Sequence, residues 1–355
     1  MPTFRSGPVL RILEARAGLQ RVEVDLGSGP ERAYVLTELT GAVEVGERVV
    51  VNTTAVDLGL GTGGWHVVHW SLDRTEFSEP GPGHILKLRY TSAQVDTGSA
   101  EEHHPDLADA DDLGGVPVVH VPLHSQLPAA VLGVRSVRPD ARIAYVMTDG
   151  AALPLALSDL VAALRERNLI DLTVTSGHAF GGDLEAVGPA AALLAARVAG
   201  RADVVVVAMG PGIVGTGTRF GHTGTEAAVW LDTAAHLGGV PIVALRTSFA
   251  DPRERHHGVS HHALTTLSRL VGSRSQVVVP AVGGDEERRI RVDLDAGGVT
   301  DRHDVVSGPA PDVLGAFAAH GLHVTSMGRP AAEDPVLFLA AAAAGAHAAG
   351  LTTNR

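Results

Sequence analysis

Hydrophobic positions along the chain follow two different periods. In residues 1–95, apolar and polar residues alternate over short runs, and residues 22–26 alternate strictly, as a half-buried strand does. Glycine-rich turns separate this run from further predicted strands at residues 34–36, 48–51, 66–70 and 85–88. Short strands at this spacing predict a small all-β N-terminal domain, either a barrel or a sandwich.

From residue 116 onwards, apolar runs alternate with helix-like segments. The runs predict buried strands at residues 116–121, 142–147, 172–175, 202–208, 240–245 and 276–279, with a shorter strand at 322–325. The other segments predict helices at residues 153–167, 189–199, 224–237 and 260–271, and an alanine-rich helix at 335–349. This alternation is typical of βαβ units, so we expect residues 116–355 to form a Rossmann-like α/β domain with a mostly parallel sheet and flanking helices.

Residues 96–115 separate these two regions. They are rich in Asp and Glu and poor in apolar residues. Because segments of this composition have little to bury, we expect an acidic linker or surface loop between the two domains.

The most prominent chemical feature is the glycine-rich loop that follows the predicted strand at 202–208. Ligands of open α/β sheets bind beyond the carboxyl ends of the strands, and glycines let backbone amides approach an anion closely. The predicted anion-binding residues of this loop are Gly210, Gly212, Gly215, Thr216, Gly217 and Thr218. The alternative is a tight turn without a ligand. Arg246 and Arg253 follow the next strand and are predicted to hold a carboxylate or phosphate with paired hydrogen bonds.

A second polar loop follows the predicted strand at 172–175. It contains His178, Asp183 and Glu185 among glycines, and Asp149 follows the neighbouring predicted strand. A histidine with nearby carboxylates can serve as a general base with an orienting partner, so these residues are the catalytic candidates. Solvation of an ordinary loop is the alternative interpretation.

Histidines concentrate just before the predicted helix at 260–271. Ser260 is a predicted N-cap, which places the next two histidines in the first helical turn, where the helix dipole favours neutral imidazole. Neutral imidazole is the form that binds a metal. The predicted ligands of a divalent metal are Asp251, His256, His257, His261 and His262. Surface and capping histidines around a turn are the alternative.

Composition excludes several classes of function. A net charge of −12 argues against general nucleic-acid binding. The chain has no cysteine, which rules out disulfides, thiolate metal sites and cysteine nucleophiles. The N-terminus lacks an apolar signal core, and the alanine-rich segment near the C-terminus is too short and too weakly hydrophobic to span a bilayer. We therefore expect a soluble cytoplasmic protein that binds neither nucleic acid nor membrane.

Three motifs in the chain resemble those of an uncharacterised bacterial family catalogued as domain of unknown function 3866 (DUF3866). They lie at residues 175–187, at 209–218, and at 248–253 together with 256–262, and the similarity covers essentially the whole chain. Residues 221–224 read Gly-His-Thr-Gly where the family pattern has Gly-Phe-Ser-Gly. The resemblance implies the α/β fold and a cytoplasmic setting, and it implies no particular chemistry.

Taken together, these features favour an enzyme that acts on a small anionic molecule, with phosphorylated compounds as the first candidates and a divalent metal as the candidate cofactor. A nucleotide or metabolite sensor without catalytic activity is the main alternative, and a structural partner in a larger complex is the third. A sensor needs the glycines and arginines but not the histidines. The sequence leaves the formation of a homo-oligomer open.

Overall fold

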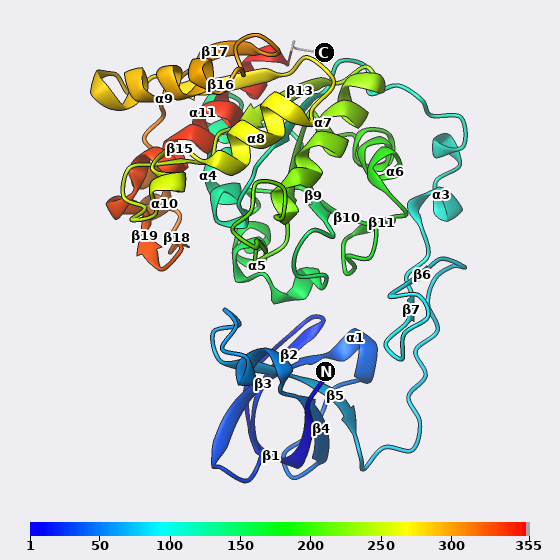
Figure 1. Cartoon of the computed structure of the whole chain (residues 1–355). Helices are drawn as coiled ribbons and strands as arrows, with labels where there is room; N and C mark the ends of the chain where they lie inside the picture. The colour runs from blue at the N-terminus through cyan, green and yellow to red at the C-terminus, as the bar shows by residue number, and fades with distance from the viewer. Residues whose placement is uncertain (353–355) are drawn as a thin grey trace. The chain divides into compact units, whose positions relative to one another are not determined.

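The structure, a computed structural model, describes residues 1–352 as two compact units (Figure 1). The first unit is Met1–Gly98 and the second begins at Ser99. Among the described residues, no helix is both long enough and apolar enough to cross a membrane.

The first unit is built around a closed five-stranded barrel, which decides between the predicted barrel and sandwich. Its strands follow the order β1-β2-β3-β5-β4, with β3 and β5 parallel. Alternate residues of β2 and β3, such as Val22, Val24 and Val35, point inward and are fully buried. The bounds are β1 Phe4–Arg16, β2 Leu19–Asp25, β3 Pro30–Leu36, β4 Arg48–Asn52 and β5 Trp65–Ser71, with short helices α1 Thr37–Thr40 and α2 Thr54–Asp57.

Two features of this unit differ from the predicted strands. The sequence pattern did not indicate β1, because two register shifts interrupt its pairing with β2 and its outward residues include apolar side chains. The predicted strand at 85–88 does not enter the barrel. Only β6 Leu86–Lys87 is extended there, and it pairs with β7 Val95–Asp96.

The second unit contains the predicted parallel sheet, with eight strands in the order β11-β10-β9-β12-β8-β13-β16-β17. Every residue of the central strand β12 is buried, because helices cover both faces of the sheet. The strands are β8 Pro117–His120, β9 Ile143–Thr148, β10 Leu172–Ser176, β11 Leu184–Ala186, β12 Val204–Met209, β13 Val240–Ala244, β16 Gln276–Pro280 and β17 Asp304–Gly308.

Two groups of helices cover the sheet. The first group shares one core cluster and consists of α4 Leu127–Val137, α5 Asp159–Glu166, α10 Val313–Ala319 and α11 Pro335–Leu351. The second group packs in two other clusters and consists of α6 Pro189–Leu194, α7 Ala227–His236, α8 His261–Arg269 and α9 Gly284–Ala296. Val206 and Ala208 of β12 belong to the first cluster, whereas Val205 and Val207 face the second group, so the two groups lie on opposite faces.

Helices α4 and α11 approach each other closely at two glycines. A methyl group on Gly133 would overlap the carbonyl group of Ala342, and one on Gly345 would overlap that of Ala130. The alanine-rich composition of α11 therefore reflects tight helix packing inside the core.

Several predicted boundaries move. The helix predicted at 153–167 begins only at Asp159, because the Ser158 side chain caps it by accepting the amide hydrogen of Val161. The strand predicted at 322–325 is reduced to β18 Thr325–Ser326, which forms a hairpin with β19 Arg329–Pro330 outside the main sheet.

The acidic segment at 96–115 contains more packed structure than its composition indicates. It holds a short helix, α3 Ala100–His103, and a turn of 3-10 helix, Pro105–Leu107. The side chains of Ala100, Leu107 and Leu113 are buried in the core cluster around α6. Most of the few apolar side chains of the segment therefore reach the core, whereas Ala108 is exposed.

The order of the strands creates a crevice at β8. The chain leaves β8 through α4 on one face of the sheet, whereas the neighbouring strands β12 and β13 continue through α7 and α8 on the other face. Adjacent connections that diverge in this way mark the usual ligand position in open α/β sheets. The loops after β8, β12 and β13 are therefore where a site is expected.

Candidate functional site

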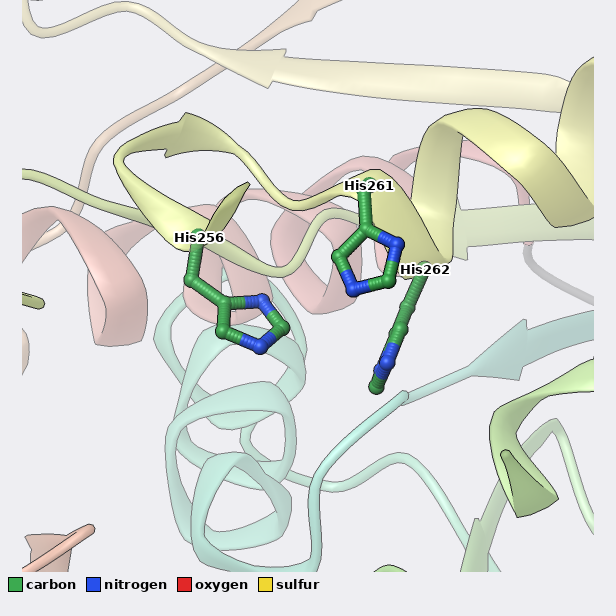
Figure 2. Close-up of side chains that lie close together, drawn as sticks. All are labelled: His256, His261 and His262. Atoms are coloured by element: carbon green, nitrogen blue, oxygen red, sulfur yellow. The ribbon is translucent and has the colours of Figure 1, made fainter. Parts of the chain in front are cut away.

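Four histidines gather at this crevice. His222 follows the loop after β12, and the other three come from the segment between β13 and α8. The rings of His222 and His262 stack with centroids 3.7 Å apart and planes 9° apart. The ring centroids of His256 and His261 lie 5.0 and 4.3 Å from that of His262. Figure 2 shows His256, His261 and His262 extending into the same space.

A short hairpin and a helix cap place these side chains. Strands β14 Thr247–Ser248 and β15 Gly258–Val259 pair and return the chain toward α8. Gly258 permits this turn, because its φ is +77°. Ser260 then caps α8, as predicted, and its hydroxyl oxygen also lies 2.8 Å from Nδ1 of His256. One serine thus links the start of the helix to the preceding histidine.

His256, His261 and His262 form the group that fits a metal ion. Each side chain offers one nitrogen, and the three nitrogens lie within 4.8 Å of one another. Burial lowers the pKa of His256 to about 3 and that of His262 to about 2, and it also lowers the pKa of His261. The imidazoles are therefore neutral at pH 7, as metal ligation requires. The main cause is burial, with nearby positive charge as a further one, rather than the helix dipole invoked from the sequence.

Buried ring nitrogens mark the same place. Nε2 of His261 is buried and makes no hydrogen bond within the described part of the chain. The ring nitrogens of His222 are also buried, with the backbone of Arg219 as a nearby polar group. A buried polar atom without a partner costs about 1–3 kcal/mol, so native proteins usually satisfy it with a water or an ion. The sequence prediction missed His222. Its one signal was the departure from the family pattern at residues 221–224.

Arg246 brings a buried positive charge to the histidines. Its side chain comes from the end of β13, is 5% exposed, and donates a hydrogen bond of 3.1 Å from Nη1 to Nδ1 of His262. Burial lowers the pKa of Arg246 to about 10, and the charge of Arg253 adds to this shift. A buried guanidinium among other cations favours a bound anion.

A small pocket of about 30 Å³ lies beside Arg246 and His262. His120, at the end of β8, and Thr266 of α8 also line it, and His120 Nε2 and Thr266 Oγ1 are buried without a hydrogen-bond partner among residues 1–352. The space suffices for a water molecule or a small ion. Together, the loops of β8, β12 and β13 all contribute to this region, as the strand order predicts.

Asp251 and His257, which the sequence also predicts as metal ligands, lie outside the group of three histidines. The carboxylate of Asp251 receives two hydrogen bonds from the Arg253 side chain, at 2.9 and 2.7 Å, and Arg329 lies 3.7 Å away. These contacts hold the pKa of Asp251 well below its usual range. His257 is exposed and packs edge-on against Phe249. Arg253, predicted to bind a ligand, is likewise engaged by Asp251.

The glycine-rich loop is an exposed turn that leads to His222. Gly215 pairs with His222, and the amide of Thr216 donates to the carbonyl of Gly221. The hydroxyl groups of Thr216 and Thr218 bond to each other and to the backbone of Gly221. The two threonines thus stabilise the loop itself, and anion binding by its amides stays a prediction.

Of the other glycines in this loop, two adopt a conformation that other residues rarely take. The φ angles of Gly212 and Gly217 are +100° and +80°. Gly210 is buried, and a side chain there would overlap the carbonyl group of Ala152. These three glycines are therefore explained by the turn and by close packing.

The acids of the second polar loop are held by hydrogen bonds within the fold. Asp183 bonds to Arg165 at 2.6 Å and accepts the amide hydrogen of Thr173. Glu185 accepts the amide hydrogen of Gly181 and the hydroxyl hydrogen of Thr175. These contacts fasten the loop to β10, which favours a structural role for both acids.

The remaining two catalytic candidates lie next to each other. The Asp149 carboxylate accepts the amide hydrogen of His178 at 3.1 Å. Nearby, Glu226 is an ionisable group that the sequence prediction missed: it accepts a 2.6 Å hydrogen bond from the Thr148 hydroxyl group. Burial raises the pKa of Glu226 to about 7, and the charge of Asp149 adds to the rise.

Comparison with models of protein families gives a match that covers most of the chain. The family model described as protein of unknown function (DUF3866) matches residues 32–345. No curated protein and no solved structure matches the chain. The matched region begins within β3 and includes β4 and β5 of the barrel, the entire parallel sheet and all four clustered histidines. The chain therefore belongs to the DUF3866 family.

Proposed function

We propose that the protein is an enzyme in which His256, His261 and His262 hold a divalent metal and Arg246 binds a small anionic substrate. The observation that carries this proposal is the convergence of three neutral imidazoles beside a buried guanidinium. Both lie at the divergent strand connections where α/β proteins bind their ligands.

The chemistry of the residues supports metal-assisted hydrolysis as the reaction class. Three protein ligands leave coordination positions open for water and substrate, as in catalytic zinc sites. A metal in such a site lowers the pKa of its bound water to about 7 and polarises a carbonyl or phosphoryl oxygen. Arg246 supplies the planar, permanently charged donor group that suits a carboxylate or phosphate.

Metal content and affinity test the first half of the proposal. Purified protein without a tag should bind zinc or manganese near one equivalent, measured by elemental analysis and by titration calorimetry of the metal-free protein. His256→Ala and His261→Ala should each lower the affinity for the metal at least about tenfold, because each removes a ligand. Even substitutions of residues that only support metal ligands typically cost about 10–100-fold. His257→Ala is the matched control, because His257 is exposed and outside the group. Equal losses in all three variants, or no binding by the folded parent, would overturn the metal site.

Turnover of candidate substrates tests the second half of the proposal, that the protein is an enzyme. The metal-loaded protein is assayed against a panel of phosphate monoesters, phosphodiesters and carboxylate esters, with His261→Ala as the inactive reference. Metal-dependent turnover that disappears in this variant supports the enzyme. Saturable anion binding without turnover across the panel would instead favour the metabolite sensor. A cytoplasmic location is a further part of this proposal.

A further inference from the structure

The N-terminal unit contains a pocket that is much larger than the one beside Arg246. Its volume is about 510 Å³, within the range of small-molecule sites. It lies against β5 and the connection between β4 and β5. The side chains that line it include three rings and several neutral polar groups: Trp65, Trp70, His69, Asn52, Thr54 and Thr62.

Of the described residues, no Asp, Glu, Lys or Arg lines this pocket. An uncharged wall with few polar groups disfavours an ionic ligand in the pocket itself, because nothing there would compensate a buried charge. Trp70 offers a flat apolar surface, and so does the part of the Trp65 ring that Tyr34 and Arg32 leave uncovered. Asn52 Oδ1 accepts the amide hydrogen of Thr54, and Thr54 Oγ1 accepts that of Thr3, so Asn52 Nδ2 and the Thr54 hydroxyl group can serve as donors to a ligand. This combination suits a flat, neutral ring with polar edges.

Neighbouring side chains hold one of these tryptophans in place. Trp65 stacks on Tyr34, with ring centroids 4.7 Å apart and planes 18° apart. The Arg32 guanidinium lies 4.8 Å from the centre of the Trp65 ring. The orientation of this pocket wall is therefore set before any ligand arrives, which lowers the entropic cost of binding.

One side of the pocket coincides with a loop that binds ligands in other five-stranded barrels. Five-stranded barrels of the OB type bind ligands on the face of strands 2 and 3 and at the loop between strands 4 and 5. The corresponding connection here spans residues 53–64 and contributes Thr54, Leu60 and Thr62 to the pocket. Leu60 is 58% exposed, which leaves an apolar side chain at the pocket unpacked.

We propose that this pocket binds a heteroaromatic base, stacked on a tryptophan and recognised at its edges by Asn52 and Thr54. The base can come from a free nucleoside or from an unpaired nucleotide of a single strand. The net charge of −12 opposes a long polyanion, so the free nucleoside is the expected source. This site goes beyond the proposed metal-dependent function and is independent of it.

Tryptophan fluorescence of the full-length protein tests the proposal. Two of the three tryptophans line the pocket, whereas Trp230 is buried in the second unit. Titration with adenosine, guanosine, cytidine and uridine, corrected for ligand absorption, should give saturable quenching with at least one nucleoside. The same titration with a short single-stranded oligonucleotide distinguishes the two sources. Tighter binding of the oligonucleotide would assign the base to a single strand.

Variants of one loop locate the binding. Leu60→Glu should weaken nucleoside binding about tenfold or more, because it places a charge at the pocket. Leu58→Glu is the matched control, since Leu58 lies in the same loop, is 68% exposed and does not line the pocket. A chelator should leave the quenching unchanged, which separates this site from the metal site. No saturable quenching by any probe up to about 10 mM, or equal effects of the two variants, would overturn the proposal.

Discussion

The hydrogen bond between Arg246 and His262 sets the protonation of the candidate site. A guanidinium has no acceptor and stays protonated in proteins, so Arg246 donates and Nδ1 of His262 accepts. The ring proton of neutral His262 is then on Nε2. A metal at Nδ1 has to displace Arg246, and a metal at Nε2 moves the proton to Nδ1 and breaks the same bond. Either way, metal binding frees the guanidinium for an anion.

This geometry predicts positive cooperativity between metal and anion. Phosphate at saturating concentration should tighten zinc binding about tenfold, and zinc should tighten phosphate binding equally, because coupling is reciprocal. Arg246→Gln should abolish the coupling, whereas Arg255→Gln, at an exposed position of the same loop, should retain it. Calorimetric titrations of each ligand with and without the other give both affinities. Phosphate that weakens zinc binding, or leaves it unchanged, would contradict the coupling.

His124 is a buried histidine whose role is structural, and it makes stability depend on pH. Its Nδ1 donates to the carbonyl oxygen of Met209, so Nε2 accepts the hydroxyl hydrogen of Ser158 at 2.6 Å. Burial lowers the pKa of His124 to about 4 from an ordinary value of 6.5. Below pH 6.5 the unfolded chain therefore binds this proton and the folded chain does not.

Folding stability should consequently fall with pH below 6.5 and level off only near the folded pKa of about 4. The contribution of His124 corresponds to a loss of about 2 kcal/mol between pH 7 and pH 5. Because His120, His256 and His262 add their own losses over this range, the contribution of His124 is measured as the difference between the parent and a His124 variant in urea unfolding of the metal-free protein at both pH values. His124→Gln should lower stability at pH 7 and reduce this pH-dependent loss. An equally large loss in the variant would show that other groups are responsible.

At the scale of elements, the contact between α4 and α11 is the packing feature most sensitive to a single methyl group. Gly345→Ala should destabilise the protein by about 2 kcal/mol, because the new methyl group meets the Ala130 carbonyl group inside a packed core. Gly350→Ala is the matched control on the same helix, where a methyl group meets no atom of the described residues within 4 Å. The control should be neutral or stabilising by up to about 1 kcal/mol, since alanine favours helix. Thermal unfolding compares them, and equal midpoints would contradict the close contact.

At the scale of the whole molecule, protease sensitivity should differ between the last part of the first unit and the start of the second. Glu76 and Glu79 are exposed and lie in a stretch without helix or strand, whereas Glu101 and Glu102 lie in α3. The Ser99 amide donates to Glu102 at the start of that helix, and Ala100 is buried. A glutamate-specific protease should therefore cut first after residues 76 and 79. Early cleavage after residues 101 and 102 would show that α3 unfolds readily.

The local sequence pattern was sufficient to predict the elements in which the burial of side chains follows a regular pattern along the chain. The strict alternation at residues 22–26 and the continuous apolar run of β12 were both confirmed, because each period records which faces of a strand are covered. Helices α4 and α9 were not predicted, because their sequences lack such a regular pattern of buried and exposed residues. Eight of the eleven residues of α4 are buried, so no polar face gives it a period, and α9 is mostly charged with two buried residues.

The sequence by itself therefore determined the two fold classes, the parallel sheet and the histidine-rich segment at residues 256–262. Only the tertiary structure decided which residues share the site. His222 and Arg246 join the cluster from other loops, and Asp251 leaves it because Arg253 and Arg329 hold its carboxylate. The physical reason is that periodicity reflects burial, a local property, whereas convergence depends on strand order and on competition between partners in space.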